Sequence, residues 1–403
     1  MKKLILICTL FLLLCSCGML KQIDFFSKLN KMEKQTQVTY GYGKKLSFIF
    51  DRNAILIPCK MNDTTLLLYY NSTTGLLYEQ ISANSEFPKC SKTIKLKTKN
   101  SSKQRIILTS GLKYYNIESD FFHFINMVGI ATSLSSDTIV SECASEKNPS
   151  RFVIGQEFPD KKDVMLLSFS DTTITFLDSN SIYDTTGFTW VKSLHTCEGR
   201  SIFLTIDSVE YAFLYNTGYE GCIFLPERKR YKRCFMVDGK SNCVYFHVEY
   251  ENHKKESDLF FANYRGENNS GIVTDTLITQ QTHTIKMGEW DNIAGNIQYS
   301  KKAQQPIIGM AFISHFDWII DKNNGKIYAK QISNIDSFFN LYRVNIRDGK
   351  LQVVSLPVGE KQYQLLSIID SVNGIPVNSS NICQMRDLLN KENGFKENVI
   401  VVR

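Results

Sequence analysis

An internal repeat constrains this chain more than any other feature of its sequence. Two apolar hairpins each run directly into a short polar turn, and both turns begin with asparagine, at Asn71 and Asn216. Copies of one unit fold alike, so we expect the two turns to occupy equivalent places. The turn residues are Asn71, Ser72, Thr73 and Thr74 in the first stretch, and Asn216, Thr217, Gly218 and Tyr219 in the second.

A second motif recurs in step with the first. Apolar residues precede Gly155 and Gly309, and after each glycine come an apolar run and a second short apolar segment. The spacing between the glycines is close to that between the asparagines, which predicts two copies of one unit, over residues 46–184 and 185–336. Short runs rich in β-branched and aromatic residues, separated by turn residues, predict a mostly β fold.

Composition narrows the classes of function. The chain has 403 residues, 43% of them hydrophobic, which is enough for two or three domains with cores. Its formal net charge of +7 is spread along the whole sequence, so we expect no nucleic-acid partner. The six histidines show no metal-binding spacing, and there is no Gly-x-Ser-x-Gly nucleophile elbow. We therefore expect no metal and no other cofactor.

The N-terminal segment has the pattern of an export signal. A charged start is followed by the apolar run Leu4–Leu14, which is too short to span a bilayer. Leu14–Cys17 resembles the bacterial lipobox, and Cys17 is the expected lipidation site because bulky Leu14 precedes Cys15. We expect a signal peptide over 1–16, a tether over 17–45, and a lipid anchor in the cell envelope. No acidic pair follows Cys17, which favours the periplasmic face of the outer membrane; the alternative is ordinary signal-peptidase cleavage.

Together, the paired turns and glycine motifs resemble those of the retropepsin-like aspartic proteases. The resemblance is to the duplicated, exported bacterial forms that end in a PDZ domain, and it covers residues 46–403. It implies two β-barrel lobes related by a pseudo-two-fold axis, with a cleft between them, and a small PDZ-like α+β domain over 337–403. Asn71 and Asn216 stand where the family has its catalytic aspartates, and Thr73 where it has a glycine.

Asparagine at both positions removes the chemistry of that family. Aspartic proteolysis needs two carboxyl groups that share a proton, one of which activates water. A carboxamide is neutral at every working pH and cannot accept that proton. We therefore expect a catalytically inactive homologue whose inter-lobe cleft binds a peptide or protein partner. The alternatives are an active peptidase with displaced carboxylates such as Asp317 or Asp321, a structural subunit without a ligand cleft, and two unrelated turns.

The family covers its cleft with a β-hairpin flap, and Asp238-Gly239 lies at a suitable distance after Asn216. Asp-Gly is a strong two-residue turn signal, so we include both residues in the expected binding set. In that hairpin Cys234 lies directly opposite Cys243, as a close non-hydrogen-bonded pair. The pair is either a disulfide or two small buried side chains. In the first copy, the equivalent hairpin turns at residues 99–102.

The C-terminal segment supplies the third unit. An apolar strand runs into the turn Asn373-Gly374, and a helix over Ile382–Leu389 and a last strand over Asn398–Val402 follow. This order resembles a PDZ domain. No carboxylate-binding loop of the Gly-Leu-Gly-Phe kind precedes it, which argues against the peptide binding that the resemblance implies.

Overall fold

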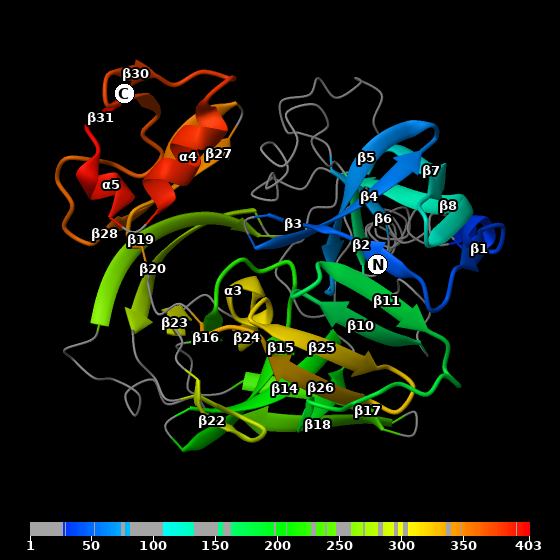
Figure 1. Ribbon diagram of the computed structural model, residues 1–403. Helices are drawn as coiled ribbons and strands as arrows, with labels where there is room; N and C mark the ends of the chain where they lie inside the picture. Colours follow the sequence, from blue (N-terminus) through cyan, green and yellow to red (C-terminus); the bar gives the residue numbers. More distant parts are fainter. Residues whose placement is uncertain are drawn as a thin grey trace, which may run out of the picture.

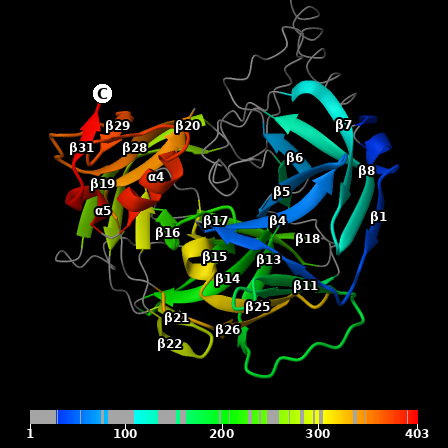
Figure 2. The same cartoon turned by 45° about the horizontal axis from the view of Figure 1, so that its top comes forward.

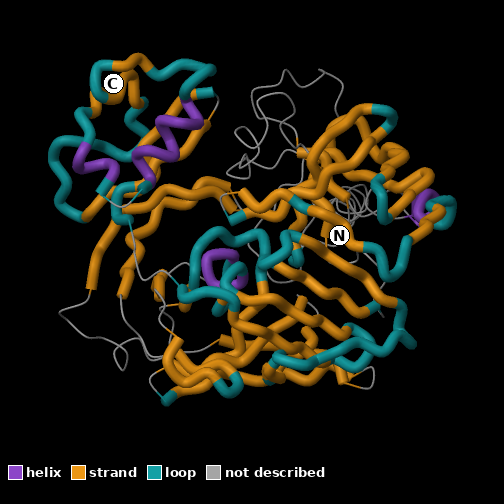
Figure 3. Tube along the Cα trace, in the orientation of Figure 1, coloured by secondary structure: helices purple, strands orange, loops and turns teal. Residues whose placement is uncertain are grey.

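Strands dominate the computed structural model of the chain (Figure 1; Figure 3), so the prediction of a mostly β fold is confirmed. Within the described residues they form five sheets, of 8, 6, 12, 2 and 3 strands. The structure describes residues 27–28, 30–51, 53–73, 77–80, 108–132, 152–155, 163–196, 199–206, 208–226, 231–237, 240–246, 259–268, 271–280, 285–293, 297–300, 305–335, 340–347, 349–391 and 393–403.

The eight-stranded sheet belongs to the first sequence copy. Its strands are β1 (Gln37–Tyr40), β3 (Ile49–Asp51), β4 (Ala54–Met61), β5 (Thr64–Asn71), β6 (Leu77–Gln80), β7 (Leu108–Glu118), β8 (Phe122–Thr132) and β9 (Phe152–Gly155). They lie in the order β1-β8-β6-β9-β5-β4-β3, and β7 pairs with both β4 and β8.

The twelve-stranded sheet begins in the second copy and continues beyond it. Its strands are β13 (Ser193–Thr196), β14 (Gly199–Ile206), β15 (Val209–Tyr215), β16 (Ile223–Pro226), β19 (Leu259–Asn268), β20 (Gly271–Gln280), β21 (Ile285–Met287), β22 (Trp290–Ile293), β23 (Ile297–Ser300), β24 (Ile307–Ile308), β27 (Arg343–Arg347) and β28 (Lys350–Pro357). The order is β22-β21-β14-β15-β24-β16-β23-β20-β19-β28-β27, with β13 paired to β14.

Both sheets contain the same pairing pattern around the strand that leads into the asparagine turn. In the first, β4 and β5 form an antiparallel hairpin, β5 pairs with β9 in parallel, β9 with β6 antiparallel, and β6 with β8 in parallel. In the second, the same signs hold for β14 with β15, β15 with β24, β24 with β16, and β16 with β23. The repeat in sequence is thus accompanied by a repeat in strand topology.

The six-stranded sheet joins the two copies symmetrically. It contains β2 (Lys45–Ser47), β10 (Val164–Ser168), β11 (Thr173–Leu177), β12 (Thr189–Val191), β25 (Phe316–Asp321) and β26 (Lys326–Gln331), in the order β12-β26-β25-β10-β11-β2. The central pair, β10 with β25, brings one hairpin from each copy together. All six residues of β25 are buried, as expected for a strand covered on both faces.

Local sequence accounts for the hairpins. Asn62 and Asp63 join β4 to β5 with φ of 44° and 67°, left-handed conformations that two-residue hairpin turns require and that Asn and Asp tolerate. In β11, Ile174 and Phe176 are buried and alternate with more exposed neighbours, as in a strand with one face against a core. One continuous hydrophobic cluster contains buried residues from both copies, such as Ile57 of β4 and Leu204 of β14.

The C-terminal unit, residues 340–403, has a hydrophobic cluster of its own. Asn373 and Gly374 have φ of 52° and 77°, which confirms the turn predicted there. The predicted helix and last strand are also confirmed. The elements after β28 are β29 (Ile369–Val372), β30 (Ile375–Pro376), α4 (Ile382–Asn390), α5 (Gly394–Glu397) and β31 (Ile400–Val402).

Sequence reasoning did not predict how this unit is attached. Its strand β28 pairs with β19, so β27 and β28 extend the sheet of the second copy. Figures 1 and 2 both show the unit next to β19 and β20.

The prediction of a tether as far as residue 45 is wrong at its C-terminal end. β1 pairs with β8, and β2 pairs with β11, so the chain enters the folded sheets at Gln37. The expected signal peptide and Cys17 lie outside the described residues. Among the residues that are described, no helix has the length and apolar character needed to cross a bilayer.

The hairpin expected to form the flap is present, and its role as a flap stays a prediction. β17 (Tyr231–Val237) and β18 (Lys240–Phe246) form the predicted hairpin, with Cys234 opposite Cys243. Asp238, Gly239 and the two cysteine side chains lie outside the described residues, so the disulfide stays a prediction. This hairpin forms a sheet of its own beside β13. The hairpin β19–β20 instead joins the main sheet through β23, where β7 pairs with β8 in the first copy. By strand pairing, β20 is therefore the counterpart of β7. The first-copy turn expected at 99–102 lies outside the described residues.

Candidate functional site

The candidate site is the pair of polar turns that follow β5 and β15. In the first copy, Asn71 pairs with Gly155 at the end of the parallel ladder. In the second, the backbone N–H of Asn216 donates to the carbonyl of Ile308, 3.1 Å away, one residue before Gly309. Each asparagine therefore lies where its strand meets the glycine strand of the same copy.

Reciprocal hydrogen bonds hold the two turns together. The hydroxyl of Thr217 accepts from the N–H of Ser72 at 2.8 Å and donates to the carbonyl of Tyr70 at 3.3 Å. The hydroxyl of Ser72 accepts from the N–H of Thr217 at 3.0 Å and donates to the carbonyl of Tyr215 at 3.0 Å. Each hydroxyl thus bridges two backbone groups of the other turn, and the structure brings the predicted residues together.

The side-chain oxygens of Asn71 and Asn216 each accept hydrogen bonds within their own turn. Oδ1 of Asn71 accepts from the N–H of Thr73 at 3.0 Å and from the hydroxyl of Thr73 at 2.8 Å. Oδ1 of Asn216 accepts from the N–H of Gly218 at 2.8 Å. A backbone N–H can only donate, so the atom that faces it must be the oxygen and not the nitrogen.

The turns differ two residues after the asparagine. The carboxamide of Asn71 lies against Gly218, where a Cβ would come within 2.2 Å of Nδ2. Thr73 occupies the equivalent place in the first turn, and its hydroxyl lies 3.5 Å from Oδ1 of Asn216 as well as close to Asn71. The Thr73 hydroxyl therefore lies between the two carboxamide oxygens. Thr74 lies outside the described residues.

The end of the second turn is closely packed. Tyr219 donates from its hydroxyl to Oε1 of Gln298 at 2.6 Å, and its carbonyl accepts from the N–H of Met310 at 2.7 Å. Gly309 lies so close that a Cβ there would be 2.3 Å from the carbonyl oxygen of Gly221 and 2.4 Å from Tyr219. Only glycine fits at this point, where the short helix α3 (Met310–Ile313) begins.

The core beneath the turns carries polar groups that sequence reasoning missed. Tyr70 and Tyr215, the residues before the two asparagines, are buried, and burial raises the pKa of Tyr70 to about 12 and that of Tyr215 well above its usual value. Arg200 of β14, which is partly exposed, interacts electrostatically with both tyrosines and with Asp321, and desolvation lowers the pKa of its guanidinium to about 10, so it remains a cation at neutral pH. The available sequence signal was the tyrosine directly before each asparagine, Tyr70 and Tyr215.

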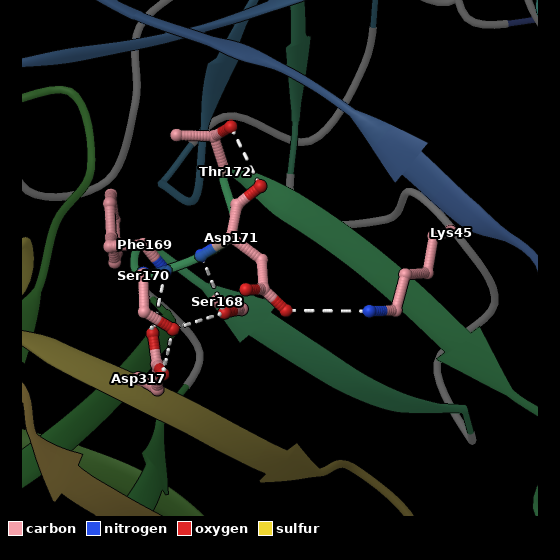
Figure 4. A network of polar contacts seen from close by, with 7 residues as sticks. All are labelled: Lys45, Ser168, Phe169, Ser170, Asp171, Thr172 and Asp317. Carbon is pink, nitrogen blue, oxygen red and sulfur yellow. Dashed lines mark hydrogen bonds and ion pairs between the residues drawn. The ribbon is translucent and has the colours of Figure 1, made fainter.

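Asp317 and Asp321, which were considered as displaced catalytic groups, accept hydrogen bonds from nearby turns. Oδ1 of Asp317 accepts from the N–H groups of Phe169 and Ser170, and Oδ2 from the hydroxyl of Ser170 at 2.7 Å (Figure 4). Oδ2 of Asp321 accepts from Tyr183 and from the side chain of Asn324, each at 2.7 Å. Burial acts to raise the pKa of Asp321, but these hydrogen bonds hold it below its usual value. Both aspartates lie on β25, in the sheet between the copies.

No metal-binding group of three or more His, Cys, Asp or Glu occurs among the described residues. No protein-family model and no curated protein matches the sequence. Among solved structures, basic 7S globulin from soybean matches with a TM-score of 0.35 at 7% identity, over 73% of this chain and 100% of the globulin. Conglutin gamma, a basic 7S globulin from lupine seeds, matches with a TM-score of 0.35 at 8% identity, over 72% of this chain and 95% of the globulin. Similarity at this level carries over neither a fold nor a function.

Proposed function

We propose that the chain is a catalytically inactive homologue of the retropepsin-like aspartic proteases. In this proposal it is lipid-anchored at Cys17 in the cell envelope, has two lobes and a PDZ-like C-terminal unit, and binds an extended peptide or a protein segment in the cleft between the lobes. The observation that carries the proposal is the pair of interlocked turns, because each places asparagine where the resemblance requires a catalytic aspartate.

Loss of catalysis follows from the groups present. Neither Asn71 nor Asn216 can act as a general base, since a carboxamide does not take up a proton in the working range. The hydroxyl of Thr73 lies close to both carboxamide oxygens. Restoring a water-activating pair therefore requires a smaller residue at 73 as well as acids at 71 and 216.

The contacts of the nearby aspartates argue against an active peptidase with displaced carboxylates. Asp317 accepts three hydrogen bonds from the turn between β10 and β11, which hold its carboxylate against that turn. Asp321 is fixed in the same way by Tyr183 and Asn324. A carboxylate that already accepts several hydrogen bonds from a neighbouring turn is a poor candidate for activating water elsewhere.

The C-terminal unit serves the fold in this proposal and does not bind peptide. The side chain of Asn390 on α4 accepts from the N–H of Val344 and donates to its carbonyl, both at 2.9 Å. The next N–H on the edge of β27 that faces away from β28 is that of Ile346, and it donates to the side chain of Asn345. An added peptide strand needs these backbone groups unoccupied. Arg343 of β27 also pairs with Glu220, at 3.3 Å, beside the second turn.

A proteolysis assay tests the loss of catalysis. We expect the unmodified protein to leave denatured casein intact at pH 4 to 6, and the triple variant Asn71→Asp, Thr73→Gly, Asn216→Asp to gain cleavage that pepstatin inhibits. The double variant that keeps Thr73 is the matched control and should gain less. Pepstatin-sensitive cleavage by the unmodified protein would contradict the proposal.

A binding experiment tests the cleft. Peptides selected from a random display library on the purified protein should lose binding to Asn216→Phe, which fills the site but keeps the hydroxyl bridges of Ser72 and Thr217. Lys45→Ala, at an exposed ion pair with Asp171 far along the six-stranded sheet, is the control. Selected peptides that bind Asn216→Phe as well as the unmodified protein would place binding elsewhere.

A further inference from the structure

We infer that the side-chain NH₂ group of Asn216 is the hydrogen-bond donor that the paired turns offer to a ligand, and that it holds a backbone carbonyl of an extended peptide. The inference rests on the proposed cleft and names the group that contacts the ligand. In a catalytic pair of aspartates, only the protonated carboxyl can donate a hydrogen bond. A carboxamide at the same place donates at every working pH.

The donors that follow the two asparagines, in the described part of the turns, all donate within the protein. They are the backbone N–H groups of Ser72, Thr73, Thr217, Gly218 and Tyr219, and the hydroxyls of Ser72, Thr73, Thr217 and Tyr219. Breaking any of these bonds to serve a ligand would leave an acceptor of the protein without its partner. None of these donors is therefore available to a ligand.

The two carboxamides differ in what lies against their nitrogen atoms. Each Oδ1 accepts from a backbone N–H of its own turn, so rotating either carboxamide by half a turn would place its NH₂ group against a donor. Nδ2 of Asn71 packs on Gly218, where an added Cβ would lie 2.2 Å from it.

Asn216 has donor capacity left over. Its Oδ1 and both backbone groups are hydrogen-bonded, but within the described part of the chain its Nδ2 makes no hydrogen bond. This nitrogen is not one of the fully buried side-chain atoms that lack a partner in the described residues, and Asn216 is partly exposed. A ligand can therefore reach it.

A backbone carbonyl is the acceptor that any peptide can supply to this nitrogen. An amide N–H can be matched only by an acceptor. In an extended peptide a carbonyl recurs at every residue, whereas carboxylates occur only at the C-terminus and at acidic side chains. A carbonyl is neutral, as the carboxamide is, so the contact needs no compensating charge. Main-chain contacts of this kind supply affinity and leave the choice of sequence to neighbouring side chains.

Asn216 thus acts as an aspartic acid that is always protonated, and this has a consequence for pH. Binding of a peptide without titratable groups should not vary with pH, because a carboxamide does not titrate. Asn216→Asp is nearly isosteric and keeps an acceptor for the N–H of Gly218. At neutral pH it turns a second acceptor toward the ligand carbonyl, which is unfavourable. Protonation of the new carboxyl group restores a donor.

The first test follows affinity against pH. The probe is a cleft-binding peptide from the display selection, resynthesised with acetyl and amide ends and without titratable side chains. Its affinity is measured from pH 7 down through the ordinary aspartate pKa of about 3.9. We expect the unmodified protein to bind equally throughout, and Asn216→Asp to bind at least about tenfold more weakly at pH 7 and to recover in acid. Asn323→Asp, at an exposed carboxamide, is the matched control and should follow the unmodified protein.

A second measurement at pH 7 identifies the ligand carbonyl, and it stands even if Asn216→Asp unfolds in acid. Each peptide bond of the probe is replaced in turn by a trans alkene, which removes the carbonyl and the N–H, or by an ester, which removes only the N–H. At one bond the alkene should weaken binding to the unmodified protein about 3- to 10-fold more than the ester does. This excess should vanish or reverse with Asn216→Asp.

Equal affinities of the unmodified protein and Asn216→Asp at pH 7, or an alkene excess that persists in the variant, would overturn the inference. The outcomes also separate it from the proposed function. If selected peptides lose binding to Asn216→Phe but bind Asn216→Asp normally, the donor assignment fails and the peptide-binding role stands. If the selection yields only peptides that bind Asn216→Phe normally, the cleft-binding role fails and the inference falls with it.

Discussion

The two polar turns are alike in what holds them together and different in what they present between them. Ser72 and Thr217 make the same pair of bonds in opposite directions. Two residues after each asparagine the symmetry ends, with Thr73 in one turn and Gly218 in the other. The two copies stay in contact although different residues, threonine and glycine, lie beside the two carboxamides. The architecture therefore does not depend on the matched geometry that a catalytic pair would need.

Removing a bridging hydroxyl should have the largest effect on stability. Thr217→Val keeps the shape of a fully buried side chain but leaves the N–H of Ser72 and the carbonyl of Tyr70 without their partner. We expect a loss of about 3 kcal/mol in the free energy of unfolding, measured by urea denaturation. Ser72→Ala, at a more exposed position, should cost about half as much. Equal costs would mean that burial does not distinguish the two bridges.

Placing threonine in the second turn, as in the first, should reduce stability somewhat less. Gly218→Thr puts a Cβ where the carboxamide of Asn71 now lies and forces it away from its two bonds to Thr73. We expect a loss of about 2 kcal/mol, again from urea denaturation. The exposed Lys326→Ala on β26 is a control that should change stability by less than about 0.5 kcal/mol. A neutral Gly218→Thr would show that the turn has more room than its packing indicates.

The reverse exchange should be mild. Thr73→Gly removes a hydroxyl that bonds Asn71 and adds backbone freedom to the unfolded chain. A loss of about 1 kcal/mol is expected in the same denaturation experiment. A cost as large as that of Gly218→Thr would contradict the asymmetry, because it would make Thr73 a structural requirement of its turn.

The smallest effect concerns pH, and it contrasts the amides of the paired turns with the two aspartates of β25. Hydrogen bonds hold the pKa of Asp321 below its usual value against the effect of burial. Its stabilising contribution is therefore present above the unfolded pKa of about 3.9 and lost as the pH falls through the lower folded value. Asp321→Asn should flatten the fall in unfolding free energy below about pH 4, measured by thermal unfolding at several pH values. An unchanged acid limb would remove Asp321 from the account.

Local patterns made much of this fold predictable. Apolar periodicity and turn residues predicted the hairpins, the Cys234–Cys243 register and the Asn373-Gly374 turn, because each depends on neighbours in sequence. The internal repeat predicted that the two asparagine turns are equivalent, which their common strand pairing bears out.

Other features depend on contacts between distant segments, and no local signal marks them. The pairing of β28 with β19 joins two units that the sequence separates. The hairpin β17–β18 forms a sheet of its own, whereas β19–β20 joins the main sheet through β23, and the number of residues after Asn216 could not show this difference. The side-chain bonds of Asn390 to Val344 and the electrostatic contact of Arg200 with Tyr70 also depend on tertiary packing.

Titration of an engineered acid pair tests most directly whether residues 71 and 216 face each other. In the variant Asn71→Asp, Asn216→Asp, the two new carboxyl carbons can be followed by ¹³C NMR across the acid range. If the side chains meet, like-charge repulsion should split the titration into two steps separated by about three pH units, as for two carboxyls that share a proton. Two independent titrations, each near the ordinary aspartate value of about 3.9, would contradict the account.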